Sequence, residues 1–292
     1  MIMRKIIFIL AALALSAAAS AQSVDYLRRY NLLLDRVGPA GLGMETLIEN
    51  WGKAEPDNVD MIQARFFYLL TKSQGSEIVH SKEAKYLGQT PVLTLKDSLG
   101  TDVHYYEVFK YDDNIFVEAV ETLQQAITVA PNRLDLRFLM ANTYMSYERG
   151  DIDLTLSYVL GLVHDFMTSD AKWFYKADSA SPQIEVDKEE FAEMMKDYCY
   201  SFFTLATPKS YQAFLKLSER MNGYFKKDAG FIGNIGSYHH VVKQDYKTAL
   251  KYYDKAIKLQ PDNTSFINNA IIAARKMNNP KLEKKYRKML EK

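Results

Sequence analysis

The chain has little cysteine, glycine or proline and no excess of charge of either sign. One of its 292 residues is cysteine, Cys199, so no disulfide can form within the chain. A chain of this length buries enough core to fold without disulfides, and we interpret Cys199 as a small buried side chain. The 37 lysines and arginines balance 36 acidic residues, for a net charge of +1. This balance argues against a nucleic-acid-binding protein and against an acidic disordered chain.

Motifs of catalysis and cofactor binding are also missing. The sequence has no His-Glu-x-x-His, no Gly-x-Ser-x-Gly, no phosphate-binding glycine loop and no dinucleotide fingerprint. The adjacent pair His239-His240 does not suit one metal ion, because neighbouring helical residues point about 100° apart. We therefore predict a protein that is not an enzyme, with no catalytic residues, no cofactor and no metal site.

A long apolar run occurs only at the N-terminus. Two basic residues precede the uninterrupted apolar run Ile6–Leu15, and Ala19-Ser20-Ala21 matches a signal-peptidase cleavage site. The run is shorter than the roughly 18 apolar residues that a transmembrane helix needs. We predict that residues 1–21 are a cleaved signal peptide, which leaves 35 basic and 36 acidic residues, a net charge of −1. The predicted location is the periplasm, the cell surface or the medium, without a transmembrane anchor.

Most of the remaining sequence has apolar residues at helical spacing between short Gly, Pro and Asp-Asn connections, which predicts antiparallel helix pairs. One pattern recurs at offsets 0, 4, 7 and 12. Offsets 0, 4 and 7 lie on one helix face, where small residues let a neighbouring helix approach, and the final proline ends the helix. The pattern occurs at Ala119, Leu123, Ala126 and Pro131, at Ala249, Tyr253, Ala256 and Pro261, and more weakly at Met44, Ile48, Trp51 and Pro56.

This pattern resembles the tetratricopeptide repeat (TPR), a helix-turn-helix unit of 34 residues. Ile235-Gly236 followed by Asp245–Leu250 looks like the paired-helix signature of that family, with one residue more between the two parts. The resemblance implies an all-α fold, a TPR-like α-solenoid of antiparallel helix pairs. The layout is similar to exported bacterial envelope TPR proteins of unknown activity.

Two stretches interrupt the helical pattern. Residues 90–112 alternate around the turn Asp97–Gly100, which predicts an inserted β-hairpin. Residues 167–187 have no helical period and contain Trp173-Phe174-Tyr175, and we favour packing of this long loop on its own helices over exposed aromatic rings. The predicted organisation is a signal peptide (1–21), degenerate helical repeats (22–89), the hairpin (90–112), TPR-like helices (113–166), the long loop (167–187) and TPR-like helices with a capping helix (188–292).

In TPR-like proteins the first helix of each pair lines a concave face. A spacing of 3, 4 and 3 on two such helices, together with the loop tryptophan, gives the candidate partner-binding residues Asp135, Phe138, Asn142, Met145, Ser265, Asn268, Ile272, Arg275 and Trp173. We predict a non-enzymatic scaffold for a protein or peptide partner in the bacterial cell envelope. One alternative is a glycan- or peptide-binding protein that uses Trp173 and Tyr105-Tyr106. Another is a hydrolase in which His164 or His239 meets a distant carboxylate.

Overall fold

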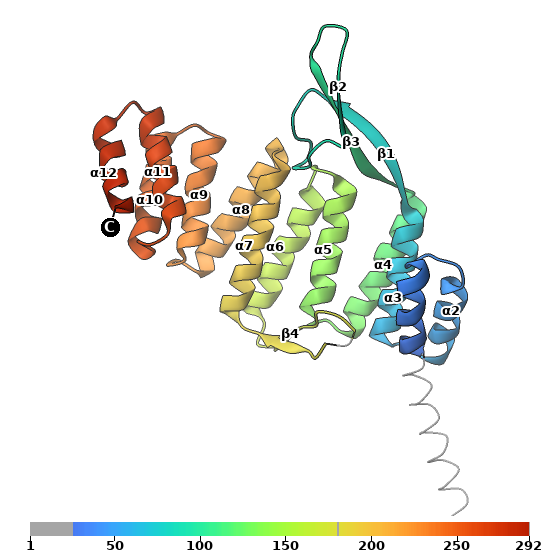
Figure 1. The fold of residues 1–292 in the computed structure, drawn as a ribbon. Helices are drawn as coiled ribbons and strands as arrows, with labels where there is room; N and C mark the ends of the chain where they lie inside the picture. The colour runs from blue at the N-terminus through green and yellow to red at the C-terminus, as the bar shows by residue number, and fades with distance from the viewer. Residues whose placement is uncertain (1–25, 180, 292) are drawn as a thin grey trace, which may run out of the picture. The chain divides into compact units, whose positions relative to one another are not determined.

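The computed structural model describes residues 26–179 and 181–291 (Figure 1). These residues divide into two compact units. Unit 1 comprises residues 26–77, 109–140, 174–179 and 181–184. Unit 2 comprises residues 78–108, 141–173 and 185–291. The predicted signal peptide, residues 1–21, lies outside the described residues.

The described residues form antiparallel helix pairs with a small inserted sheet, as the sequence predicts. The first helix spans residues 26–37. The other helices are α2 (Met44–Ala54), α3 (Val59–Ser73), α4 (Asp113–Val129), α5 (Leu134–Glu148), α6 (Asp153–Thr168), α7 (Lys188–Leu205), α8 (Pro208–Tyr224), α9 (Ala229–Val241), α10 (Tyr246–Leu259), α11 (Thr264–Lys276) and α12 (Pro280–Leu290). Within the described residues, no helix is both long enough and apolar enough to cross a membrane.

Short polar side chains begin most of these helices. Each accepts a hydrogen bond from a backbone N–H of the first turn, which has no partner within the helix. Asp187 and Glu190 form a reciprocal capping box at the start of α7, so these two acidic residues stabilise the start of that helix. The other capping residues are Asn58, Asp112, Thr207, Asp228, Asp245, Asn263 and Asn279.

The recurring pattern of small and large residues forms the buried face of alternate helices. Ala249, Tyr253 and Ala256 of α10 are all fully buried. A side-chain carbon added at Gly236 of α9 would lie 3.0 Å from the ring of Tyr253, so the glycine lets the paired helices approach closely. The equivalent residues of α4, Ala119, Leu123 and Ala126, are also fully buried.

The first repeat of unit 1 fills the same position with a large side chain. Trp51 of α2 stands where the other repeats have alanine, and it is fully buried. Tyr26 and Tyr30 of the first helix lie on its ring, with centroids 6.3 and 6.0 Å away. The indole N–H donates to Glu55 at 3.2 Å. An aromatic cluster therefore replaces the close approach of backbones seen in the later repeats.

The inserted sheet is larger than the predicted hairpin. Strands β2 (Leu93–Lys96) and β3 (Asp102–Tyr111) form the predicted antiparallel pair. A third strand, β1 (Gln74–Ser81), lies on the other side of β3. Assigning residues 74–81 to helical repeats was wrong. The few apolar residues of this segment alternate too weakly to predict a strand, and the strand forms by pairing with β3, which is distant in sequence.

The long loop contains two short strands, β4 (Trp173–Tyr175) and β5 (Ile184–Val186), neither of which was predicted from the sequence. Trp173 is 5% exposed and packs on Phe166 of α6, with ring centroids 5.4 Å apart. Phe166 in turn stacks on Phe191 of α7 at 3.9 Å. The favoured packing of the loop tryptophan on the helices is confirmed.

Candidate functional site

A groove of about 530 Å³ in unit 2 is lined by five successive helices. We call it the C-terminal groove. Its lining residues are Lys196, Tyr200 and Phe203 of α7, Phe214 of α8, Gly230, Asn234, Ser237, His240 and Val241 of α9, Tyr253 of α10, and Asn269 and Ile272 of α11. Most come from α7, α9 and α11, the first helices of three consecutive pairs.

The first helices repeat their lining residues at the spacing of the TPR unit. Tyr200, Asn234 and Asn269 are separated by 34 and 35 residues. Phe203, Ser237 and Ile272 are separated in the same way. Because equivalent positions of stacked repeats lie side by side, the groove presents one row with two amides and a tyrosine. The second row is mainly apolar.

The floor of the groove carries a neutral hydrogen-bonded network. The hydroxyl of Tyr253 donates to Ser237 Oγ at 3.3 Å and lies 3.2 Å from His240 Nδ1. Burial raises the pKa of Tyr253 to about 12. Burial, helped by the charge of Lys276, lowers the pKa of His240. Both side chains are therefore uncharged near neutral pH.

The rim of the groove is apolar, and the one cationic side chain that lines the groove, Lys196, is already paired with two carboxylates. Tyr200, Val241 and Ile272 are 70%, 47% and 43% exposed. Lys196 Nζ lies 2.8 Å from Asp228 and 2.7 Å from Glu193. Burial acts to lower the pKa of Lys196, but these two carboxylates outweigh it and the pKa is raised. The groove therefore suits a neutral ligand with apolar side chains better than an anion.

Cys199 lies next to the groove, in contact with Ser218 at 3.4 Å, and is buried. Burial raises the pKa of its thiol to about 12. Because the thiolate is the reactive form, we expect iodoacetamide at pH 8 to leave the folded protein unlabelled and to label it fully in denaturant. Mass spectrometry measures the labelling, and rapid modification of the folded protein would contradict the burial of Cys199.

The structure places one of the four C-terminal candidates in the C-terminal groove. Ile272 lines it, whereas Ser265 and Asn268 are exposed elsewhere on α11. Arg275 lies 3.0 Å from Glu283 of α12. The neighbouring Asn269, rather than Asn268, lines the groove together with Ile272.

The candidates on α5 and in the loop take part in contacts within the protein. Asn142 and Met145 belong to unit 2, where Asn142 accepts a hydrogen bond from Tyr198 at 2.9 Å and Met145 is half-buried. Trp173, buried on Phe166, is not on the groove. The sequence reasoning missed Tyr200, Asn234, Ser237, Val241 and Asn269. A period of 34 residues relates Tyr200 to Asn234, but Asn234 and Asn269 are 35 residues apart, so an exact period leads from Asn234 to Asn268 instead.

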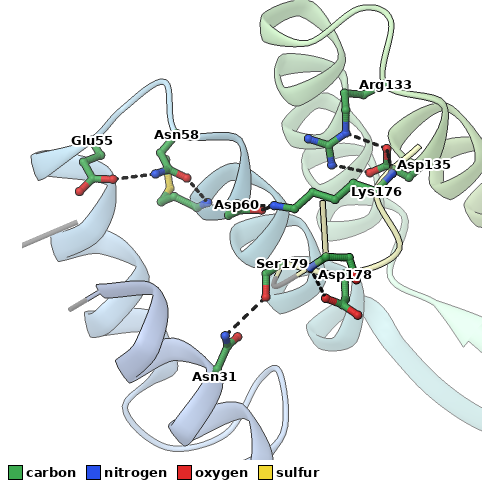
Figure 2. Close-up of polar contacts among 11 residues, drawn as sticks. Asn31, Glu55, Asn58, Asp60, Arg133, Asp135, Lys176, Asp178 and Ser179 are labelled. Carbon is green, nitrogen blue, oxygen red and sulfur yellow. Dashed lines mark hydrogen bonds and ion pairs between the residues drawn. The ribbon is translucent and has the colours of Figure 1, made fainter. Parts of the chain in front are cut away.

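Asp135 and Phe138 belong to unit 1, where they hold the loop. Arg133 donates two hydrogen bonds to Asp135, at 2.7 and 2.6 Å, and both side chains are nearly buried. The ring of Phe138 lies 6.5 Å from that of Tyr175. The backbone N–H of Lys176 also donates to Asp135, at 3.3 Å (Figure 2). These two candidates therefore anchor residues 174–179.

Figure 2 shows Lys176 extending to Asp60 at the start of α3, and Ser179 facing Asn31 of the first helix. Lys176 Nζ lies 3.1 Å from Asp60, with the two side chains 13% and 24% exposed. The first helix and α3 also line a shallow pocket beside this contact, which includes Asn31 and Asp60. The loop is thus tied to three helices of unit 1.

We expect Lys176→Met to loosen the loop, because the partly buried carboxylate of Asp60 loses the positive charge that compensates the cost of its burial. Hydrogen exchange of residues 174–179 is expected to quicken about tenfold, the equivalent of roughly 1.4 kcal/mol. The matched control is Lys172→Met, since Lys172 forms an exposed pair with Glu185, 69% and 52% exposed, and exposed pairs contribute little. Equal exchange in both variants would contradict an anchoring role for Lys176.

The residues of the aromatic and histidine alternatives, Tyr105, Tyr106, Trp173, His164 and His239, do not line the C-terminal groove. Tyr106 is fully buried and Trp173 nearly so, leaving Tyr105 as the one half-buried member of the predicted aromatic set. His239 stacks on Tyr252 at 5.7 Å. Among the described residues, no group of three or more His, Cys, Asp or Glu side chains is placed to hold a metal ion.

The stacked pairs and their recurring buried face define this chain as a TPR-like helical-repeat protein. No protein-family model matches its sequence, and no curated protein does. Among solved structures, a MamA protein is 15% identical, with 61% of this chain and 81% of MamA covered and a TM-score of 0.39. PilW, titled a widely conserved type IV pilus biogenesis factor, is 11% identical, with 95% and 92% covered and a TM-score of 0.39. A MamA chain from Desulfovibrio magneticus RS-1 is 9% identical, with 92% and 93% covered and a TM-score of 0.28.

Proposed function

We propose that this protein is a non-enzymatic scaffold that holds an extended segment of a partner protein in the C-terminal groove. The observation that carries the proposal is the pair of side-chain rows at the repeat spacing, Tyr200-Asn234-Asn269 and Phe203-Ser237-Ile272. The rows cross three first helices, so a bound chain contacts several repeats at once.

The residue types suit an extended peptide. An asparagine amide has both a donor and an acceptor, so it can pair with the N–H and C=O of a peptide backbone whatever the peptide's sequence. Apolar side chains of the same peptide would contact Tyr200, Val241 and Ile272, which are exposed at the rim. The neutral floor makes binding depend little on salt, because few charges are neutralised.

The proposed location is the bacterial cell envelope. It rests on the signal-like sequence of residues 1–21, whose basic start, apolar run and Ala-Ser-Ala site are typical of exported proteins. Export is tested by N-terminal sequencing of the protein from its native cells. A mature N-terminus at Gln22 supports the proposal, whereas an intact residue 1 in the cytoplasm overturns it.

The partner is tested by crosslinking the tagged protein in its native cells, then affinity purification and mass spectrometry. Asn269→Ala and Tyr200→Ala are expected to lose the partner. The matched controls are Asn268→Ala, which alters the adjacent exposed asparagine outside the groove, and Tyr224→Ala, which alters an exposed tyrosine at the end of α8. A partner retained by both groove variants would move the binding site away from this groove.

A further inference from the structure

A second groove lies in unit 1, between α2 and α4, with α3 as its floor. It consists of two adjoining cavities of about 640 and 420 Å³ that share Pro56, Ile62 and Gln125. We call it the acidic groove, after the five carboxylates along it: Glu45, Glu49, Asp57, Glu118 and Glu121. The C-terminal groove has no residue in common with it.

The charges of the acidic groove are unbalanced. Two cations, Lys53 and Arg65, lie among the five carboxylates, so the lining has a net charge of −3. Arg65 is already paired with Glu118 at 3.3 Å, and Glu45 is hydrogen-bonded to Tyr68. Glu49 on α2 lines the larger cavity and Glu121 on α4 lines the smaller one, and both are exposed. A bound peptide that spans the two cavities would therefore meet carboxylates of both helices.

The floor is apolar and narrow. Ile48, Met61 and Ile62 line it but are only 4%, 6% and 4% exposed, so the walls leave a thin strip of floor open. A helix, about 10–12 Å across with its side chains, is too wide for such a strip. A single extended chain is narrower, and it places successive side chains toward alternate walls.

The length of the groove and the spacing of its carboxylates match an extended peptide. Glu118 and Val129 mark the two ends of the α4 wall, 11 residues apart, which is about 16 Å of helix or about five residues of extended peptide. Glu45 and Glu49 are four residues apart, a rise of about 6 Å. Alternate residues of a strand are about 6.6 Å apart, so two side chains on the same side of a peptide reach both carboxylates.

We propose that the acidic groove binds a short extended segment, rich in lysine or arginine, of another protein. The aliphatic stems of such side chains lie on the apolar floor while their charged ends reach the carboxylates of the walls. Nucleic acids and anionic lipid surfaces are poor ligands here, because the carboxylates of the groove would repel their phosphate groups. This site is independent of the C-terminal groove and adds a second contact to the proposed scaffold.

The probe for the test is fluorescein-labelled pentalysine with blocked ends, and its binding to the purified full-length protein is followed by fluorescence anisotropy. The variant Glu49→Gln/Glu121→Gln is expected to weaken binding about tenfold at low ionic strength. The matched control, Glu107→Gln/Glu219→Gln, removes two exposed carboxylates of unit 2 and is expected to change binding less than twofold. Added salt is expected to weaken binding to the unaltered protein.

A second variant tests the shape of the site without altering charge. A side-chain carbon at Gly52 would lie 3.4 Å from Met61 Sδ, an ordinary contact, so Gly52→Leu is expected to fold and to fill the groove. It should weaken pentalysine binding about tenfold. Gly161→Leu, at a helical glycine with no neighbouring atom within 4 Å, is the control and should bind as the unaltered protein does.

Three results would overturn the proposal. Equal weakening in the two double variants would mean diffuse attraction rather than a site. Unchanged binding by Gly52→Leu would mean that the peptide does not enter the groove. If the groove variants instead alter sedimentation of the protein alone, the occupant is a second copy of this chain. None of these results bears on the asparagine variants of the C-terminal groove, so the two proposals fail separately.

Discussion

Tyr253→Ala is expected to destabilise the C-terminal repeats by about 3–5 kcal/mol. The Tyr253 ring is fully buried, packs against α9 close to Gly236, and its hydroxyl contacts Ser237 and His240. Its removal leaves a cavity between paired helices and two polar side chains without their common partner. The loss is a large part of the 5–15 kcal/mol typical of a folded domain. Urea unfolding followed by circular dichroism measures it, and hydrogen exchange locates it in α9–α11.

Two further variants separate the causes. Tyr253→Phe keeps the ring and removes the hydroxyl, so its expected cost is about 1 kcal/mol. Tyr224→Ala removes a ring that is 40% exposed, and we expect a change within about 0.5 kcal/mol. If Tyr253→Ala unfolded at the same urea concentration as the unaltered protein, the Ala-Tyr-Ala face of α10 would not be the core of its repeat.

Arg133→Met is expected to destabilise unit 1 by about 3 kcal/mol. Arg133 and Asp135 form a bidentate pair with side chains 8% and 11% exposed. Removal of one partner leaves a buried charge uncompensated, which costs more than the pair itself contributes. Because Asp135 also accepts the backbone N–H of Lys176, faster hydrogen exchange in residues 174–179 should accompany the loss.

The double variant Arg133→Met/Asp135→Leu checks this reason. It removes both charges and keeps apolar bulk, so we expect it to recover part of the stability lost in Arg133→Met. Urea unfolding of the three proteins gives the comparison. A double variant less stable than the single one would mean that Asp135 contributes chiefly through Lys176 and the first turn of α5.

The helices could be predicted from the sequence because their stabilising contacts are local or repeated. The apolar period and the offsets of alanine, a large apolar or aromatic residue and proline specify which face of α4 and α10 is buried. Trp51, which departs from the small-residue pattern, is nevertheless buried on the predicted face. Its partners Tyr26 and Tyr30 precede the repeat pattern, and their role could not be seen from spacing alone.

Strand β1 could not be predicted in the same way. Its residues have no strong alternation, and four of its eight residues are exposed. What makes Gln74–Ser81 a strand is pairing with β3, which is distant in sequence. Such non-local pairing overrides weak local preference.

The predicted partner-binding residues and the lining of the C-terminal groove overlap in part. A ligand face on the first helices agrees with the C-terminal groove, and Ile272 lies in it. Asn268 followed from the spacing of 3, 4 and 3 along α11, whereas Asn269, about 100° further around the helix, lines the groove. Arg275 is paired with Glu283 of the next helix, and Asp135 is paired with Arg133 just before its own helix. Neither partner belongs to the helix-face pattern from which the candidates were chosen.

The most direct test of the proposed groove is site-specific photo-crosslinking in the native cells. A photo-reactive amino acid is placed at the position of Val241, of Ile272 or, as control, of Asn268, and crosslinked peptides are identified by mass spectrometry. The account predicts that one partner segment crosslinks from positions 241 and 272 and not from position 268. A partner that crosslinks from position 268 alone, or that purifies with the protein but never crosslinks from the groove, would contradict it.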